Sequence, residues 1–339
     1  MSYKVLYRKY RPDSFNKIIG QTSIVETLKN SVTQGTFSHA YIFTGPRGTG
    51  KTSTAKVLSK TINCTNLKDG EACGECENCK NFSTSPDIIE IDAASNNGVD
   101  EIRELRNNIT LAPAASKYKI YIIDEVHMLS QGAFNALLKT LEEPPSHAIF
   151  ILATTEVYKV PITILSRCQR YDFKKINSRD LIAHLRAVCS QEKIEFEENS
   201  LEEIYALSEG CARDALSILD QLSKAHAKIT LGSVLETYNI ISNRDIDDLL
   251  TAIQEKNVEK IVDLIDRFED SGTNAQKILK KMINYYEKRA ISLKLGEKCG
   301  ISFTIIDRLI KNLNSCYIDA RINENVFTMI KMSFLELID

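Results

Sequence analysis

Short apolar runs alternate with segments of helical periodicity in the first half of the chain. The runs occupy residues 41–43, 88–95, 119–125 and 148–153. Runs of this length, bounded by polar turns, are typical of buried strands. Apolar residues three and four apart, with turn and proline signals, predict helices at residues 23–32, 53–58, 99–109, 132–143 and 162–165. Strands that alternate with helices in this way predict an α/β domain with a parallel sheet.

The pattern changes after Pro161, because all seven prolines lie at or before that residue. The rest of the chain is rich in helix formers with three- and four-residue apolar spacing, which predicts helix throughout. Breaks at Gly232 and at Ser242 and Asn243 divide this part into two helical units. The predicted domains are an α/β domain at residues 1–177, a helical domain at 178–242 and a second helical domain at 243–339.

Length and composition narrow the class of protein without naming its function. A chain of 339 residues, 43% hydrophobic and 26% charged, is expected to form two or three globular domains. Its formal net charge of −2 gives no overall basic field, so any contact with nucleic acid must be a local patch. No apolar run is long enough for a membrane span or a signal core, and the scattered lone cysteines suit a reducing cytoplasm. We therefore expect a cytoplasmic protein with no membrane contact.

The first candidate for chemistry is the segment from Gly45 to Thr52, which has the form G-x-x-x-x-G-K-T. It follows a predicted strand and precedes a segment of helical periodicity that begins at Ser53, as a P-loop requires. Glycines let the backbone amides point inward, and the helix dipole adds positive potential, so a polyphosphate would be held largely by backbone. In this motif Lys51 reaches the β- and γ-phosphates and the Thr52 hydroxyl ligates Mg²⁺.

The ends of two later strands carry the polar residues that accompany a P-loop. The run at 119–125 ends in Asp124, suited to order the Mg²⁺ shell, and Glu125, suited to polarise an attacking water. The run at 148–153 is followed by Thr154 and Thr155, whose hydroxyls could sense the γ-phosphate, hold the attacking water or make a local turn bond. Arg167 could be a surface charge or could be presented to the phosphates of a neighbouring subunit.

Four cysteines lie between the P-loop helix and the next predicted strand. Cys64, Cys73, Cys76 and Cys79 have the spacing C-x8-C-x2-C-x2-C, with turns at Gly70 and Gly74. Four thiolates at this spacing can surround a tetrahedral Zn²⁺, whereas ordinary buried cysteines or a redox pair are the alternatives. No vacant ligand position is indicated, so the sequence predicts a structural zinc site in a module of about residues 64–79.

Taken together, these motifs resemble the AAA+ ATPases, and most closely the ATPase subunits of bacterial sliding-clamp loaders in DNA polymerase III. The resemblance is carried by the four cysteines and by residues 10–12, 45–52, 91–95, 123–129, 137–145, 153–155 and 166–168. It implies a parallel-sheet P-loop AAA+ domain with a zinc-binding insertion, a helical lid and an all-α collar that joins subunits.

The resemblance also implies roles that spacing alone does not give. Arg11, Pro12 and Ile19 would border the adenine, and Gly45, Gly48, Thr49 and Gly50 would hold phosphates with Lys51 and Thr52. Thr155 would be the first sensor of the γ-phosphate and Arg213 the second, and Arg167 would be an arginine finger acting on ATP in the adjacent subunit. ATP, Mg²⁺ and Zn²⁺ are the cofactors implied.

The implied activity is ATP-driven opening and loading of the sliding clamp onto primer–template DNA. The implied partners are further copies of the same kind of subunit, delta and delta-prime subunits, the clamp, and DNA contacted along its backbone, with Lys139 and Lys159 as candidate contacts. Longer relatives carry a tail that would begin beyond Asp339. One alternative is a non-hydrolysing scaffold, against which the intact Lys51, Thr52, Asp124 and Glu125 argue. Another is a DNA-translocating motor, against which the cysteine module and the sequence at residues 166–168 argue.

Overall fold

The computed structural model describes residues 3–99, 108–296, 302–320, 323 and 325–338. The helix predicted at 99–109 falls mostly outside these residues. Backbone contacts divide the chain into two compact units, Met1–Ile229 and Thr230–Asp339, and each is described here by itself.

A five-stranded parallel sheet forms the centre of the first unit, with the strand order β2-β3-β4-β1-β5. Its strands are β1 Ala40–Thr44, β2 Ile88–Asp92, β3 Lys119–Asp124, β4 Ala148–Thr154 and β5 Gln169–Asp172. Strands β1 to β4 confirm the four predicted strands and the parallel α/β class. In register, Asp92 lies opposite Asp124 and Thr44 lies opposite Thr154, so the polar strand ends meet at one edge of the sheet.

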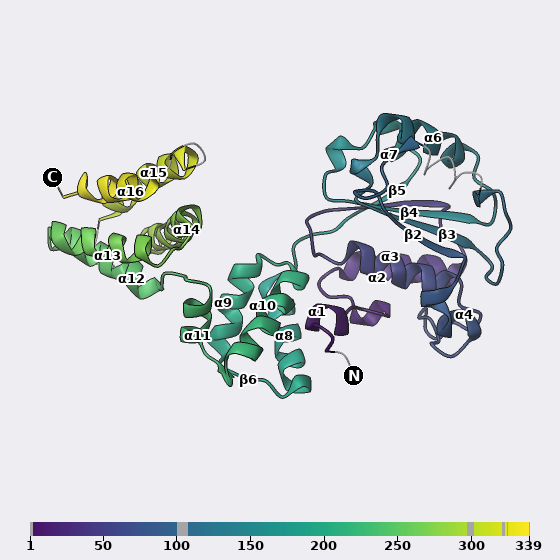
Figure 1. Ribbon diagram of the computed structural model, residues 1–339, viewed down its shortest axis with the longest axis horizontal. Coiled ribbons are helices and arrows are strands. Elements are labelled where there is room, and N and C mark those ends of the chain that lie inside the picture. The colour runs from purple at the N-terminus through teal and green to yellow at the C-terminus, as the bar shows by residue number, and fades with distance from the viewer. Residues whose placement is uncertain (1–2, 100–107, 297–301, 321–322, 324, 339) are drawn as a thin grey trace. The chain divides into compact units, whose positions relative to one another are not determined.

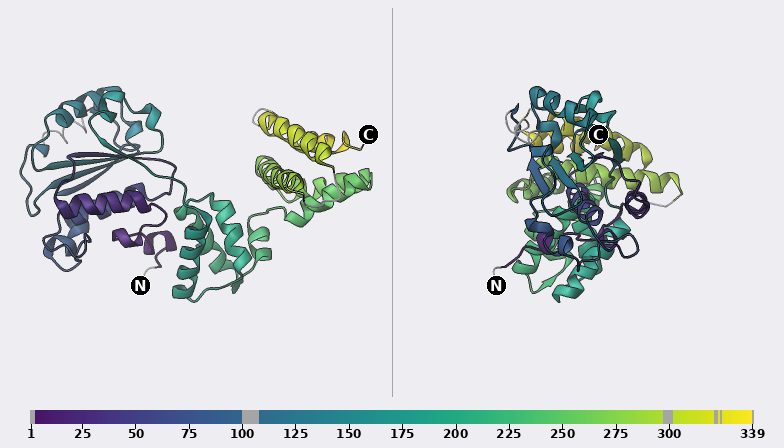
Figure 2. Two further views of the ribbon diagram at one scale, coloured as in Figure 1. Left: turned by 180° about the vertical axis from the view of Figure 1, so that it is seen from behind. Right: turned by 90° about the vertical axis from the view of Figure 1, so that its right-hand side faces the viewer.

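Helices cover both faces of this sheet (Figure 1). Helices α2 (Thr22–Gln34) and α3 (Lys51–Ile62) lie on one face, and α6 (Gln131–Glu142) and α7 (Ile162–Leu165) lie on the other, as the view from behind also shows (Figure 2). The side chains of β1 point alternately to the two faces of the sheet. Tyr41 and Phe43 pack in the core beneath α2 and α3, whereas Ala40 and Ile42 pack in the core beneath α6. These helices confirm four of the predicted ones.

Three helices and a small parallel pair of strands follow the sheet in the same unit. They are α8 Ser178–Glu192, β6 Glu195–Phe196, α9 Glu198–Ser208, α10 Ala212–Ala225 and β7 Lys228–Ile229. Helix α1 (Leu6–Lys9) lies beside α10, and the Leu6 amide donates to Asp220 of α10 at 3.2 Å. The described part of the unit also contains the short elements η1 Phe15–Lys17, α4 Glu77–Lys80, η2 Phe82–Thr84, η3 Val126–Met128 and η4 Val157–Lys159.

The second unit is built from helices as far as the structure describes it. They are α11 Leu231–Thr237, α12 Asn243–Gln254, α13 Val258–Asp270, α14 Ala275–Lys294, α15 Phe303–Asp319 and α16 Val326–Leu335. The apolar faces of α12 to α16 share one core around the fully buried Tyr286, which includes Leu249 and Ile265 as their helical spacing predicts. Among the described helices of the whole chain, none is long and apolar enough to cross a membrane.

The prediction of helix throughout the chain after Pro161 is wrong at three places. Strand β5 adds to the sheet beside β1, and β6 and β7 pair with each other between the helices. In β5 only Tyr171 is buried, so this edge strand lacks the apolar run that marks a central strand. Proline-free, helix-rich composition does not exclude strands this short, because their backbone pairing is decided by tertiary contacts.

Candidate functional site

A cavity of about 990 Å³ opens at the edge of the sheet where β2 and β3 end. Its wall combines the N-terminal segment, the P-loop and the start of α10. Eleven predicted site residues line it: Arg11, Pro12, Ile19, Gly48, Thr49, Gly50, Lys51, Thr52, Asp124, Glu125 and Arg213. Residues far apart in the sequence thus meet around one space.

The backbone of the P-loop requires glycine at specific places. Gly45, Gly48 and Gly50 have φ values of +133°, +71° and +102°, a range that other residues rarely adopt. A Cβ at Gly45 would lie 2.2 Å from the carbonyl oxygen of Phe173, and one at Gly48 would lie 1.9 Å from Cys211 Sγ. Gly45 is therefore packed against Phe173, the residue that follows β5, whereas Gly48 is packed against the start of α10.

Lys51 begins α3 and its side chain lies inside the loop. Its Nζ donates to the carbonyl oxygens of Gly45 and Pro46, each at 2.8 Å. Burial lowers the pKa of Lys51, and the nearby carboxylates of Glu125 and Asp124 oppose that shift. A buried cation beside the N-terminus of a 12-residue helix favours an anion such as a phosphate at this point.

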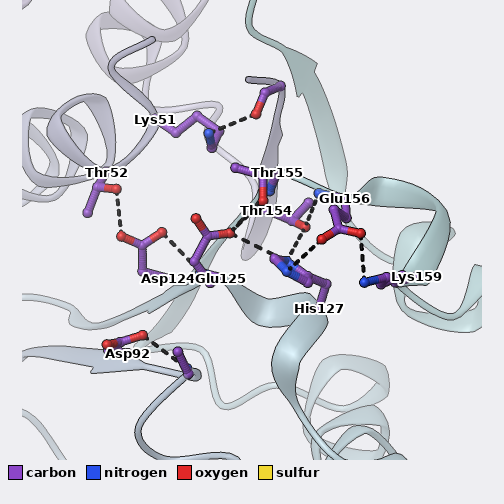
Figure 3. A network of polar contacts seen from close by, with 12 residues as sticks. Lys51, Thr52, Asp92, Asp124, Glu125, His127, Thr154, Thr155, Glu156 and Lys159 are labelled. Carbon is purple, nitrogen blue, oxygen red and sulfur yellow. Dashed lines mark hydrogen bonds and ion pairs between the residues drawn. The ribbon is translucent and has the colours of Figure 1, made fainter. Parts of the chain in front are cut away.

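Thr52 and Asp124 form a close pair of oxygen groups at the end of β3 (Figure 3). The Thr52 hydroxyl donates to Asp124 Oδ2 at 2.7 Å, and the amide of Glu125 donates to Asp124 Oδ1 at 3.0 Å. Hydroxyl and carboxylate oxygens are the ligands that Mg²⁺ prefers, and a few of them suffice when phosphates supply the rest. Glu125 itself has a φ of +48°, which turns the chain sharply after the strand.

The carboxylate of Glu125 is held by residues from the next strand end and from η3 (Figure 3). Its Oε2 accepts hydrogen bonds from the Thr155 amide at 3.3 Å and the Thr155 hydroxyl at 3.0 Å. The ring Nδ1 of His127 lies 3.4 Å from the same oxygen. Thr155 does not line the cavity, but it orients a residue that does.

His127 and Thr154 extend this network, and the sequence pattern predicts no role for His127. Nδ1 of His127 lies 3.0 Å from the Thr154 hydroxyl, and Nε2 lies 3.5 Å from a carboxylate oxygen of Glu156. Glu156 in turn pairs with Lys159 at 2.7 Å. The local turn bond considered for this strand end is made by Thr154, which accepts from the Glu156 amide at 3.0 Å. The only sequence signal was the closeness of His127 to Glu125.

Arg213 lines the cavity from the start of α10, and Arg11 lines it from the N-terminal segment. The Arg213 guanidinium lies 5.1 Å from the centre of the Tyr7 ring, a cation–π contact between α10 and the N-terminal segment. Arg11 Nε donates to the Ser53 hydroxyl at 3.3 Å. The amide of Ala212 also donates to the Gly48 carbonyl at 3.2 Å, so the start of α10 touches the P-loop directly.

Arg167 lies outside the cavity. Its guanidinium is fixed at the end of α7 by the Thr163 carbonyl at 2.7 Å and by the Glu142 carboxylate at 2.6 Å. The structure therefore does not bring Arg167 together with the other predicted site residues. An action on a neighbouring subunit, the role implied by the resemblance, stays a prediction.

The four predicted cysteine ligands converge at one point. Their sulfur atoms all lie within 4.8 Å of one another, and none of the four is in a disulfide. The amides of Cys76 and Glu75 lie 3.3 and 3.4 Å from Cys73 Sγ and lower the pKa of that thiol. The thiol pKa is lowered at Cys76 as well, to about 6, and is raised by burial at Cys64 and Cys79. Four sulfurs so close suit a tetrahedral metal with sulfur bonds of about 2.3 Å.

Comparison with known families gives matches over the first unit. A family model described as DNA polymerase III, delta subunit, matches residues 20–177. A second, described as the ATPase lid domain of the DNA polymerase III clamp loader subunit, matches residues 180–223. Solved structures of the Thermotoga maritima RuvB Holliday junction branch migration motor share the fold, with a TM-score of 0.52 at 19% identity over 73% of this chain and 80% of that one.

Individual relatives are much closer in sequence. DNA polymerase III subunit tau of Bacillus subtilis is 48% identical over 289 residues, which cover 84% of this chain and 51% of the relative. The chain thus spans about half the length of that longer relative. Subunit gamma of Buchnera aphidicola subsp. Baizongia pistaciae is 38% identical over 305 residues, which cover 88% of this chain and 82% of the relative. This identity over most of both chains shows that the chain belongs to the gamma/tau family of DNA polymerase III clamp loader subunits.

Proposed function

We propose that the chain is an ATP-hydrolysing motor subunit of a bacterial clamp loader, which loads the sliding clamp onto primer–template DNA within the DNA polymerase III holoenzyme. One observation carries the proposal: the P-loop, the Thr52–Asp124 pair and Arg213 line a single cavity in a member of this family. The intact Lys51 argues against a non-hydrolysing scaffold. Its site of action would be the cytoplasm, where bacterial replication takes place.

In this proposal the polyphosphate of ATP lies along the P-loop amides and the N-terminus of α3. Lys51 contacts the β- and γ-phosphates, and Arg213 reaches the γ-phosphate from the lid. Arg11, Pro12 and Ile19 border the base, on the side of the cavity formed by the N-terminal segment.

The hydrolytic step would rest on residues at the end of β3. Thr52 and Asp124 would hold Mg²⁺, which neutralises phosphate charge when bound. Glu125 polarises the attacking water, and Thr155 acts as a sensor by orienting the Glu125 carboxylate. This assignment is supported by the 3.0 Å hydrogen bond from the Thr155 hydroxyl to the Glu125 carboxylate.

Arg167 would complete the site of an adjacent subunit. Its position outside this chain's own cavity is compatible with such a role, since an arginine finger in comparable enzymes is supplied from a partner. Because such a finger contributes about 10³- to 10⁵-fold to kcat, the isolated chain is expected to be a poor ATPase. Further copies of the chain and delta and delta-prime subunits are the proposed partners.

The proposed domain organisation has an AAA+ domain at residues 1–177, a lid at 178–242 and a collar at 243–339. It is supported by the start of α8 at Ser178 and the start of α12 at Asn243. The four cysteines would hold Zn²⁺ as a structural site, which is supported by their convergence. DNA would be contacted along its backbone, with Lys139 and Lys159 as candidates, and this binding should weaken as salt rises.

The decisive experiment compares steady-state ATP hydrolysis by the wild type and the Arg167→Ala variant in the reconstituted loader. The chain is combined with delta, delta-prime and the clamp, with and without primer–template DNA. We expect DNA to raise the rate and Arg167→Ala to abolish the increase while ATP still binds. Rapid turnover by the lone chain, unaffected by Arg167→Ala, would contradict the loader mechanism. The other candidate, a DNA-translocating motor, is favoured only by a fold likeness at 19% identity.

A further inference from the structure

The cysteine module makes contacts beyond its own four thiols, and the most specific involve Glu71. The Glu71 carboxylate accepts the Phe15 amide at Oε2, at 2.9 Å, and the Asn16 amide at Oε1, at 3.1 Å. Lys29 Nζ of α2 lies 3.4 Å from Oε1. The Glu71 side chain is only 13% exposed, and its contacts with Phe15 and Lys29 are partly buried, whereas the contact with Asn16 is open to solvent.

These hydrogen bonds cap the turn η1. Backbone amides in the first turn of a helix have no partner within the helix and need an acceptor. Ser14, the residue before η1, makes no side-chain hydrogen bond to the turn. Glu71 therefore accepts the hydrogen bonds that a Ser or Asp next to the turn usually accepts, although it lies more than fifty residues further along the chain.

The capped turn leads directly into the wall of the cavity. Phe15 is 1% exposed and packs in the core with Leu28 of α2, and its carbonyl accepts the Ile18 amide at 3.0 Å. Ile18 and Ile19 then line the cavity beside Arg11. Any movement of η1 consequently moves the surface on which the base of a nucleotide would lie.

The segment that carries Glu71 is itself fixed in place. Lys68 and Glu71 exchange two backbone hydrogen bonds, at 3.0 and 2.9 Å, which form a tight turn. Gly70 in that turn has a φ of +72°, and a Cβ there would lie 2.7 Å from both Lys29 Cγ and the Thr33 hydroxyl. Cys73 lies two residues after Glu71, so we expect closure of the cysteine cluster to hold this turn against α2.

We propose that Glu71 is a positioning residue for nucleotide binding, through which the cysteine module holds the wall of the ATP cavity. This inference rests on the proposed function, because it assumes that ATP occupies the cavity. Without the cap, the segment from Phe15 to Ile19 must be ordered when the ligand binds, and that ordering opposes binding. The loss of a helix cap of this kind should raise the Kd for ATP about 5- to 30-fold.

The test measures ATP binding to the full chain by calorimetry for the wild type, Glu71→Gln and Glu71→Ala. The matched control is Glu75→Ala, since Glu75 belongs to the same module but its carboxylate contacts the exposed Lys68 at 3.1 Å. Two further measurements accompany each titration: zinc content, and hydrogen exchange of the amides from Phe15 to Ile19. Glu71→Gln keeps the size of the side chain but puts a donor where one amide needs an acceptor.

We expect Glu71→Gln to keep its zinc, to bind ATP more weakly and to exchange these amides faster, while Glu75→Ala matches the wild type. Unchanged affinity and exchange in a Glu71→Gln chain that retains zinc would overturn the inference. Loss of zinc from both Glu71 variants would overturn it too, because Glu71 would then serve the module rather than the cavity wall. If the wild type does not bind ATP, the proposed function fails instead.

Discussion

From the close approach of Gly48 to Cys211 we predict how much the free energy of unfolding falls when a side chain is added to the P-loop at this point. In Gly48→Ala, the φ of +71° costs about 1–2 kcal/mol for a residue with a Cβ. The new Cβ would also lie 1.9 Å from Cys211 Sγ in a buried contact, and overpacking of this kind costs about 1–3 kcal/mol more. The free energy of unfolding should therefore fall by about 2–5 kcal/mol.

A second substitution separates the two costs. Cys211→Ala removes Sγ and leaves the nearest Cys211 atom, its Cβ, at 3.3 Å from the new Cβ. In that background Gly48→Ala should cost the backbone part and only a small remainder of the packing part, because 3.3 Å is close but not a severe overlap. The double-mutant cycle should therefore give a coupling of about 1–3 kcal/mol. The assay is urea unfolding of the four chains without nucleotide. An equal cost of Gly48→Ala in both backgrounds would refute the packing argument.

Three further predictions concern the network around Glu125, a buried carboxylate and the cysteine cluster. His127→Phe removes the ring nitrogens beside Glu125, so kcat in the reconstituted loader should fall at least about tenfold with the Kd for ATP unchanged; a parallel rise in Kd would point to damage of the cavity instead. Burial raises the pKa of Asp87, but backbone hydrogen bonds from residues 114–116 outweigh it and hold the pKa below its ordinary value. The charged form thus stabilises the fold above about pH 4, and this contribution is lost as pH falls through the lower folded pKa. Asp87→Asn should cost about 2–3 kcal/mol in urea unfolding at pH 7 and progressively less in acid, and a cost independent of pH would contradict this account. Cys76→Ser should lose bound zinc by metal analysis while Cys168→Ser, outside the cluster, keeps it; equal zinc in both would exclude the proposed ligand set.

The parts of the candidate site that could be predicted from sequence are those formed by residues close together in the chain. The P-loop is one continuous turn, and Asp124 and Glu125 end one apolar run, so local pattern was enough to identify them. The cysteines lie within sixteen residues, and their spacing alone limits where the sulfurs can meet. Strand β5 was missed because a short edge strand with one buried side chain has no such local signature.

The parts that could not be predicted depend on contacts between distant segments. His127 contacts Thr154 across two adjacent strand ends, and this pairing requires the order of β3 and β4 in the sheet. Glu71 looked like an ordinary polar residue of the cysteine module. Its acceptor role appears only when the module packs on α2 and η1, which no periodicity in the sequence encodes.

The N-terminal segment is held by hydrogen bonds near both of its ends, and these contacts lie on different parts of the first unit. Near its start, Asp220 of α10 accepts the Leu6 amide at 3.2 Å and pairs with Lys224 at 2.7 Å. Near its end, Glu71 caps η1 on the side of α2. Several of the residues between these contacts, Tyr7 and Arg11 among them, line the cavity. Because residues 6–16 connect α10 to η1 and contribute to the cavity wall, we expect a displacement of α10 relative to the sheet to change the shape of that wall.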